Sequence, residues 1–200
     1  LLICDQFTSN IIILTFAYKI QDGSLSGELT KPIHPMLTGA LTNNVSFKVL
    51  SMMGLAPIWL VLFFLFRPDF SGVTFNNILL ALPVLVIAFF IGYLLSATIT
   101  SLAFWTTRVY SVHEFYFAFI LLFSGQFVPL PLMPKLVQDI AQYLPFQLLL
   151  YFPIQLILGK LPTEQILLGY IMAGVWLALS VIIFNLVWRN GVKRYSAVGA

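Results

Sequence analysis

Charged residues are the scarcest class in this sequence. Asp, Glu, Lys and Arg make up 8% of the 200 residues, whereas hydrophobic residues make up 60%. A soluble domain carries about 25% charged residues, so this chain could not cover a surface that faces water on all sides. Most of its surface is therefore expected to face lipid.

Cysteine and histidine are also scarce. Cys4 is the only cysteine, which excludes an internal disulfide and leaves a metal site without its usual ligand cluster. The ten Lys and Arg residues are scattered between apolar segments, a pattern typical of topology signals and not of nucleic-acid binding. The chain starts with neither a methionine nor a basic lead-in, so we expect a missing N-terminal part and no signal peptide.

Long charge-free runs are the main feature that is present. A membrane-crossing helix needs about 20 apolar residues. The predicted spans are 49–66, 78–97, 115–128 and 165–188. Residues 1–18 are predicted to be part of an earlier helix. The fold class is therefore an all-α, polytopic membrane protein, with a single transmembrane domain over residues 1–200.

Residues 129–163 interrupt this pattern with six prolines, too many for one straight helix. KLVQDIAQYL (135–144) separates apolar and polar faces at a helical period, as a helix at a membrane interface does. If this segment turns back without crossing, the tail 189–200 is cytoplasmic, and seven of the ten basic residues, including those of the tail, lie on the cytoplasmic side. A crossing would place the C-terminal basic cluster on the wrong side. We therefore predict a re-entrant or interfacial segment on the outer face.

The largest polar interruption is 19–48, which the same charge count places in the cytoplasm. It begins with KIQDGSLSGELTKPIHP (19–35), in which Gly23 can end the incoming helix in a left-handed conformation. Ser24 or Ser26 can cap a new helix, which Pro32 then stops.

The new helix would place Leu25 and Leu29 on one face, with Glu28 and Lys31 pointing elsewhere. Two interpretations remain open. The segment is either an ordinary loop on the membrane surface, or a docking element whose leucine face fills a groove on a cytoplasmic partner. His34, between two prolines, is expected to be exposed.

Other candidate residues carry weaker signals. Arg108, His113 and Glu114 at the inner mouth of a helix form either a second cytoplasmic contact or a solvated anchor. Ser96 and the hydroxyl residues after it either line a polar strip or bond their own backbone. The candidate substrate-path aromatics, which could equally pack or face lipid, are Trp59, Phe63, Phe119 and Phe123.

The spans 49–66, 78–97 and 165–188 hold no charged residue. Intramembrane charge marks ion and proton routes, so its absence argues against a proton-coupled transporter. It also argues against a metal-dependent membrane transferase, which needs acidic pairs. The chain has no Gly-x-x-x-x-Gly-Lys-Ser/Thr phosphate loop, no catalytic residues are predicted, and ATP would be handled by another chain.

Several stretches resemble the permease subunits of type-2 ABC exporters, in the six-helix, drug-export-like branch. The pattern Gly23-Ser24-Leu25, followed by Leu29 and Pro32, is similar to the segment after the second helix of that family. The more specific stretches are FWTTRVYSVHEFYF (104–117), FSGQFVPLPLMPKLVQDIAQYLPFQLLLYFPIQLILGKL (123–161) and WRNGVKRYSAVGA (188–200).

This resemblance implies six helices with both termini in the cytoplasm, of which the first and part of the second precede this chain. It implies a cytoplasmic coupling helix that meets an ATPase subunit, and short re-entrant helices before the last span. The implied coupling residues are Gly23, Ser24, Leu25, Glu28, Leu29, Lys31 and Pro32.

The implied function is ATP-driven export of an apolar or amphipathic compound, drug-like or lipid, by alternating access. ATP and magnesium would sit on the partner ATPase, with no cofactor bound by this chain. The other expected partners are a second permease chain, identical or not, and the lipid bilayer of a bacterial plasma membrane; no nucleic acid is expected. The alternative function is a polytopic membrane protein without transport activity, such as a scaffold or a lipid-modifying enzyme.

Overall fold

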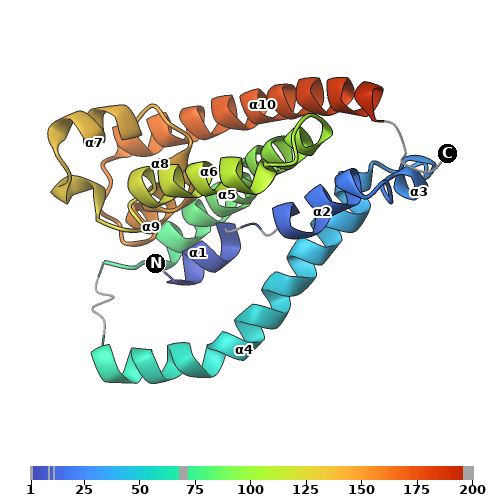
Figure 1. Ribbon diagram of the computed structural model, residues 1–200. Coiled ribbons are helices and arrows are strands. Elements are labelled where there is room, and N and C mark those ends of the chain that lie inside the picture. The colour runs from blue at the N-terminus through green and yellow to red at the C-terminus, as the bar shows by residue number, and fades with distance from the viewer. Residues whose placement is uncertain (1, 9, 11, 68–71, 196–200) are drawn as a thin grey trace.

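The computed structural model of the chain describes residues 2–8, 10, 12–67 and 72–195. Over these residues every regular element is helical, which confirms the predicted all-α class. Figure 1 shows a bundle with α3 and the last turns of α10 at one end and α7 at the other. We call these the inner end and the outer end, after the sidedness predicted from the charges.

Helix α5 (Phe75–Ser101) is the centre of the bundle. It starts at Thr74, whose side chain accepts a hydrogen bond from the Asn77 N–H at 3.2 Å and so caps the helix. Its buried face carries small residues, including Ala81, Ala88 and Ala97, which allow neighbouring helices to approach closely. Helix α10 (Thr163–Arg194) is its most extensive neighbour, and the other helices that pack on it include α1, α2, α6, α8 and α9.

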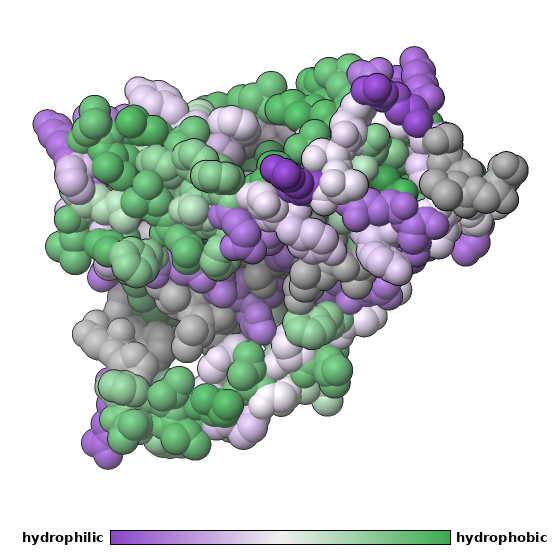
Figure 2. All heavy atoms as spheres, in the orientation of Figure 1, coloured by the Kyte–Doolittle hydropathy of each residue, from purple (hydrophilic) through white to green (hydrophobic). Residues whose placement is uncertain are grey.

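Helix α4 (Thr42–Phe66) stands apart from this bundle (Figure 1). It follows the π-helical turn η1 (Met36–Leu41) directly, so it begins seven residues before the predicted span. None of its most apolar 18-residue window is buried. Figure 2 shows hydrophobic side chains over α10 and the outer half of α4, with hydrophilic ones gathered around α3 and the end of α10.

The first segment is two helices, α1 (Leu2–Thr8) and α2 (Ile12–Gln21), where one helix was predicted over 1–18. A helix that ends leaves its last carbonyls without partners. Side chains supply them here: the Thr8 hydroxyl donates to the Cys4 carbonyl at 3.2 Å, and the Lys48 ammonium donates to the Gln6 carbonyl at 2.7 Å. Lys48 is therefore buried against α1.

The predicted span 115–128 is also corrected. The connecting turn η2 (Leu102–Phe104) leads to α6 (Val109–Phe123), which starts six residues earlier than predicted and ends five residues earlier. Gly125, with φ 78°, turns the chain away soon after α6 ends. At 15 residues, α6 is about 22 Å long, shorter than the hydrocarbon core of about 30 Å.

The proline-rich region consists of short helices at the outer end: η3 (Leu130–Leu132), α7 (Lys135–Ala141), α8 (Phe146–Leu149) and α9 (Tyr151–Ile157). The chain leaves α6 and enters α10 at this same end (Figure 1). Within the residues that the structure describes, three helical stretches are long and apolar enough to cross a membrane, namely 42–66, 75–104 and 163–194. The chain is thus a multi-pass membrane protein.

Candidate functional site

The segment after α2 forms the short helix α3 (Ser26–Leu29). Gly23 has φ 85°, so the predicted left-handed end of the incoming helix is confirmed. The Leu25 N–H donates to the Lys19 carbonyl at 3.0 Å and closes the turn. The predicted serine cap is wrong, because no side chain caps α3.

The two serines bond elsewhere. The Ser24 hydroxyl donates to Asp22 Oδ1 at 2.7 Å, and the Ser26 hydroxyl donates to the Gly23 carbonyl at 2.9 Å. The hydrogen bonds from the Ser24 backbone and side chain hold the pKa of the exposed Asp22 carboxyl below its ordinary value. Asp22 therefore stays ionised and fixes the turn that starts the segment.

An ion pair ties α3 to α2. The Lys19 ammonium and Glu28 Oε1 lie 2.5 Å apart, with both side chains partly shielded from solvent. The same ammonium lies 5.8 Å from the centre of the Phe16 ring, within cation–π range. Since Lys19 is on α2 and Glu28 on α3, the two helices are held as one unit.

Leu25 corrects the docking hypothesis. It is 0% exposed and belongs to a hydrophobic cluster at the inner end, which we call the inner cluster, and Leu29 packs against it. The leucine face therefore points into the protein and cannot fill a groove on a partner. The surface that this segment presents to solvent instead includes Ser24, Ser26, Gly27, Thr30, Lys31, Pro32 and Ile33.

The inner cluster joins this segment to the membrane helices. Besides Leu25, it contains Phe16 and Ala17 of α2, Ala97 of α5 and Trp188 of α10; its other members include Ile20, Met36, Ala40, Tyr93 and Phe184. Close packing of this kind transmits displacement because its side chains have no free volume in which to yield. A force on the segment therefore reaches at least three long elements.

His34 was expected to be exposed, and the structure corrects this. Its ring lies 4.8 Å from the Trp188 ring and 5.7 Å from the Phe184 ring, both on α10. Nδ1 accepts the Met36 N–H at 3.2 Å, while the buried Nε2 has no hydrogen-bond partner. Burial lowers the pKa of His34 below its ordinary value, so the neutral ring is favoured.

Arg108, His113 and Glu114 do not form one group. Arg108 lies in the connection between α5 and α6, and the neighbouring Thr107 carbonyl is 3.5 Å from the Gln21 amide at the end of α2. This connection therefore lies beside the segment at the inner end. His113 instead lines a cavity inside the bundle, while Glu114 is exposed.

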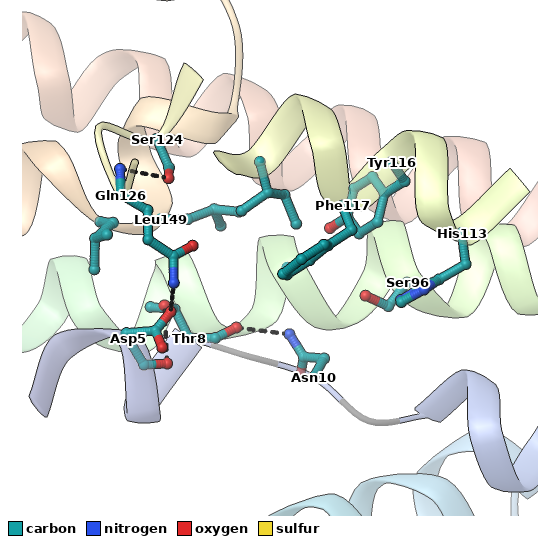
Figure 3. A pocket seen from close by; sticks show the side chains of 13 residues that line it. Asp5, Thr8, Asn10, Ser96, His113, Tyr116, Phe117, Ser124, Gln126 and Leu149 are labelled. Atoms are coloured by element: carbon teal, nitrogen blue, oxygen red, sulfur yellow. Dashed lines mark hydrogen bonds between the residues drawn. The ribbon is translucent and has the colours of Figure 1, made fainter. Parts of the chain in front are cut away.

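That cavity, which we call the polar cavity, has a volume of about 140 Å³. Figure 3 shows Asp5 and Gln126 near one end, His113 and Ser96 at the other, and Tyr116 and Phe117 between them. Gln126 Nε2 donates to Asp5 Oδ1 at 3.2 Å. The further lining residues are Thr8, Asn10, Gly92, Ile120, Ser124, Leu149 and Leu150.

Sequence patterns identified little of this cavity, because its residues come from separate segments and form no local motif. Ser96 was predicted either to line a polar strip or to bond its own backbone, and it lines the polar cavity. The hydroxyl groups of Thr98, Thr100 and Ser101 bond carbonyls of their own helix, at 2.7–2.8 Å.

The four candidate path aromatics lie on two helices. Trp59 and Phe63 are on α4, and Phe63 is 48% exposed. Phe119 and Phe123 are on α6 and stack on each other and on Phe146, with ring centres 6.0–6.3 Å apart. None of the four lines the polar cavity.

Comparison with known proteins gives one family. The family model described as "ABC-2 family transporter protein" matches residues 2–199. No curated protein and no solved structure matches the chain.

Proposed function

Because the chain belongs to the ABC-2 family of transporter proteins, and is thus a membrane-spanning permease subunit of an ABC transporter, we propose that it exports an apolar or amphipathic compound. Family membership decides against the alternative of a scaffold or lipid-modifying enzyme. In this proposal the compound moves out of the cell across a bacterial plasma membrane, and it is drug-like or a lipid. The spans without charge support it, since an apolar route suits drug-like molecules and lipids.

The driving force in this proposal is a separate ATPase subunit that binds ATP and magnesium. ABC-2 permeases generally work with such a subunit. ATP-dependent closure of the ATPase would push on the segment from Gly23 to Pro32. A second permease chain, identical or different, would complete the pathway, and the pair would alternate between inward-facing and outward-facing states.

The observation that carries the proposal is how this segment is attached. The Lys19–Glu28 ion pair fixes it to α2, and Leu25 places it in the inner cluster with α5 and α10. Through these two attachments, a displacement of the segment would be passed on to the membrane helices. The docking face is the solvent-exposed side of the segment, which includes Gly27 and Lys31.

Cross-linking tests the docking face. A Gly27→Cys variant in a Cys4→Ser background is treated in membranes with a short bifunctional thiol–amine reagent. Gly27 is suited to this because a side chain there meets no atom within 4 Å. We expect an adduct with the ATPase subunit, identified by mass spectrometry, and we expect compound efflux to fall when the adduct forms.

The matched control is Leu136→Cys on α7, which is 72% exposed at the outer end. It should give no adduct with the ATPase. An ATPase adduct at position 136, together with none at position 27, would refute the assignment of the docking face.

A further inference from the structure

The polar cavity is unusual for its place in the protein. The helices around it are mostly apolar, yet eight side chains with polar groups, from Asp5 to Gln126, face its 140 Å³. Polar cavities inside proteins hold water or the polar part of a ligand, while empty cavities are apolar. In a membrane protein, an ionisable side chain that lines a cavity marks a functional site.

The lining of the cavity carries one acidic side chain. Asp5 contributes a carboxylate, and no lysine or arginine is among the lining residues. Lys48 of α4 lies outside that lining, where it donates to the Gln6 carbonyl of α1, but it is near enough to interact electrostatically with Asp5. An ammonium ligand would therefore share the Asp5 carboxylate with Lys48. His113 faces the cavity from the end opposite Asp5 (Figure 3).

Aromatic and apolar groups complete the wall. Tyr116 and Phe117 of α6 lie between the two polar ends (Figure 3), and Ile120, Leu149 and Leu150 add aliphatic surface. A carboxylate combined with aromatic rings is the chemistry that recognises organic ammonium groups. The aliphatic side suits the hydrocarbon part of the same molecule.

We propose that the polar cavity binds the ammonium group of an amphiphilic amine, with Asp5 as its counter-ion. This rests on the proposed function, because it names the chemical class of the transported compound. The ammonium group could belong to a free amphiphilic amine or to the headgroup of an aminophospholipid.

The test measures binding of radiolabelled decylammonium to the full-length permease with its ATPase partner in nanodiscs. Decanol is the uncharged comparison ligand, and empty nanodiscs correct for partition into lipid. We expect saturable binding of decylammonium at least about tenfold tighter than that of decanol, as a charge-assisted contact provides. Asp5→Asn, which keeps the shape of the side chain, should abolish that preference.

Glu164→Gln is the matched control, because Glu164 is exposed at the start of α10 and does not line the cavity. It should keep the preference. If Asp5→Asn fails to fold, Tyr116→Leu replaces it, and binding of decylammonium should weaken while binding of decanol stays the same. Equal binding of the two ligands to the unmodified protein, or a preference that survives Asp5→Asn, overturns the proposal.

A competition arm distinguishes the two sources of the ammonium group. Short-chain phosphatidylethanolamine displaces decylammonium if the site accepts lipid headgroups, whereas phosphatidylglycerol does not. If neither lipid competes, the ligand is a free amine. Selective binding of decylammonium without any ATP-driven movement of amine would refute the export function but support the binding site. ATP-driven transport without a preference for ammonium would support export but refute the binding site.

Discussion

At the scale of single residues, the inner segment depends on the backbone at Gly23. Its φ of 85° lies in a region that costs an L-residue about 1–2 kcal/mol. Gly27, four residues later, lies inside α3 with open space around its Cβ position. The two glycines are close in sequence, yet only the first is required by the fold.

We therefore predict opposite effects of alanine at these positions. Gly23→Ala should lower the free energy of unfolding by about 1–2 kcal/mol through backbone strain. Gly27→Ala should leave it unchanged or raise it by up to about 1 kcal/mol, because alanine favours helix. Thermal unfolding of the purified variants in one detergent provides the comparison. A Gly23→Ala variant as stable as Gly27→Ala would contradict the left-handed turn.

His34 gives a prediction about pH. Because its pKa is lowered in the folded protein, the unfolded chain binds more protons at and below the ordinary value of 6.5. The stabilising contribution is thus full above pH 6.5 and declines as pH falls through that value toward the lower folded-state pKa, by at most about 1.4 kcal/mol per pH unit.

The melting temperature measured from pH 8 to pH 5 tests this prediction. The difference between the unmodified protein and His34→Gln should shrink as pH falls, because glutamine can accept the same N–H and does not titrate. A difference that is constant over this range would show that His34 is not buried in its neutral form.

The sequence could predict Gly23 but not the environment of Leu25 or His34. A glycine at a helix end is a local signal, whereas the partners of His34 lie on α10, about 150 residues further along the chain. The burial of Leu25 also means that a Leu25→Asp variant would not test docking. Leu25 is fully buried, so a charge there would destabilise the fold and would say nothing about a partner.

At the scale of elements, α10 approaches its neighbours where it carries glycine. A Cβ at Gly169 would lie 2.1 Å from the Phe152 ring of α9, and one at Gly191 would lie 2.2 Å from the Phe104 ring of η2. Gly174, on the same helix, has no atom within 4 Å of its Cβ position. Two of these three glycines therefore allow close packing of aromatic rings.

Gly169→Ala is expected to destabilise the protein by about 1–3 kcal/mol, the usual cost of overpacking. Gly174→Ala, with the same change of residue on the same helix, should cost nothing. Loss of the α9–α10 contact should also make the outer short helices more accessible to protease, which limited proteolysis in nanodiscs would detect. Equal behaviour of the two variants would refute the close contact with Phe152.

Charge and proline located most elements from the sequence alone. Arg67 marks the end of α4 because a charged group leaves the apolar phase, and the prolines of 129–163 mark short helices because they break longer ones. Arg189 marks no such end, because α10 continues to Arg194. The break between α1 and α2 carried no such mark. The polar cavity was not predicted either, because the residues that line it become neighbours only once α1, α5 and α6 pack together.

At the scale of the whole molecule, the polar segments sort to the two ends of the bundle. The segment from Gly23 to Pro32, the α5–α6 connection and the end of α10 lie at one end, and α7 lies at the other (Figure 1). This arrangement agrees with the charge count, in which the C-terminal basic residues share a side with Lys19 and Lys31. The sidedness itself stays a prediction.

Cysteine labelling of intact cells tests this sidedness. In a Cys4→Ser background, Leu136→Cys should react with a membrane-impermeant maleimide, whereas Gly27→Cys and Lys193→Cys should react only after the cells are opened. All three replaced side chains are outside the core, so folding should not limit the comparison. Labelling of position 193 from outside would mean that the segment 129–163 crosses the membrane.

The length of α10 has a consequence for transport. Its 32 residues span about 48 Å, well beyond the hydrocarbon layer of about 30 Å. It touches Phe152 at one extremity and the His34 ring at the other. An unbroken helix of this kind moves as a rigid rod. When its tip at the inner end of the bundle is pushed sideways, the opposite tip must swing in response, so the outer end of the bundle can open by a tilt with no change inside the helix.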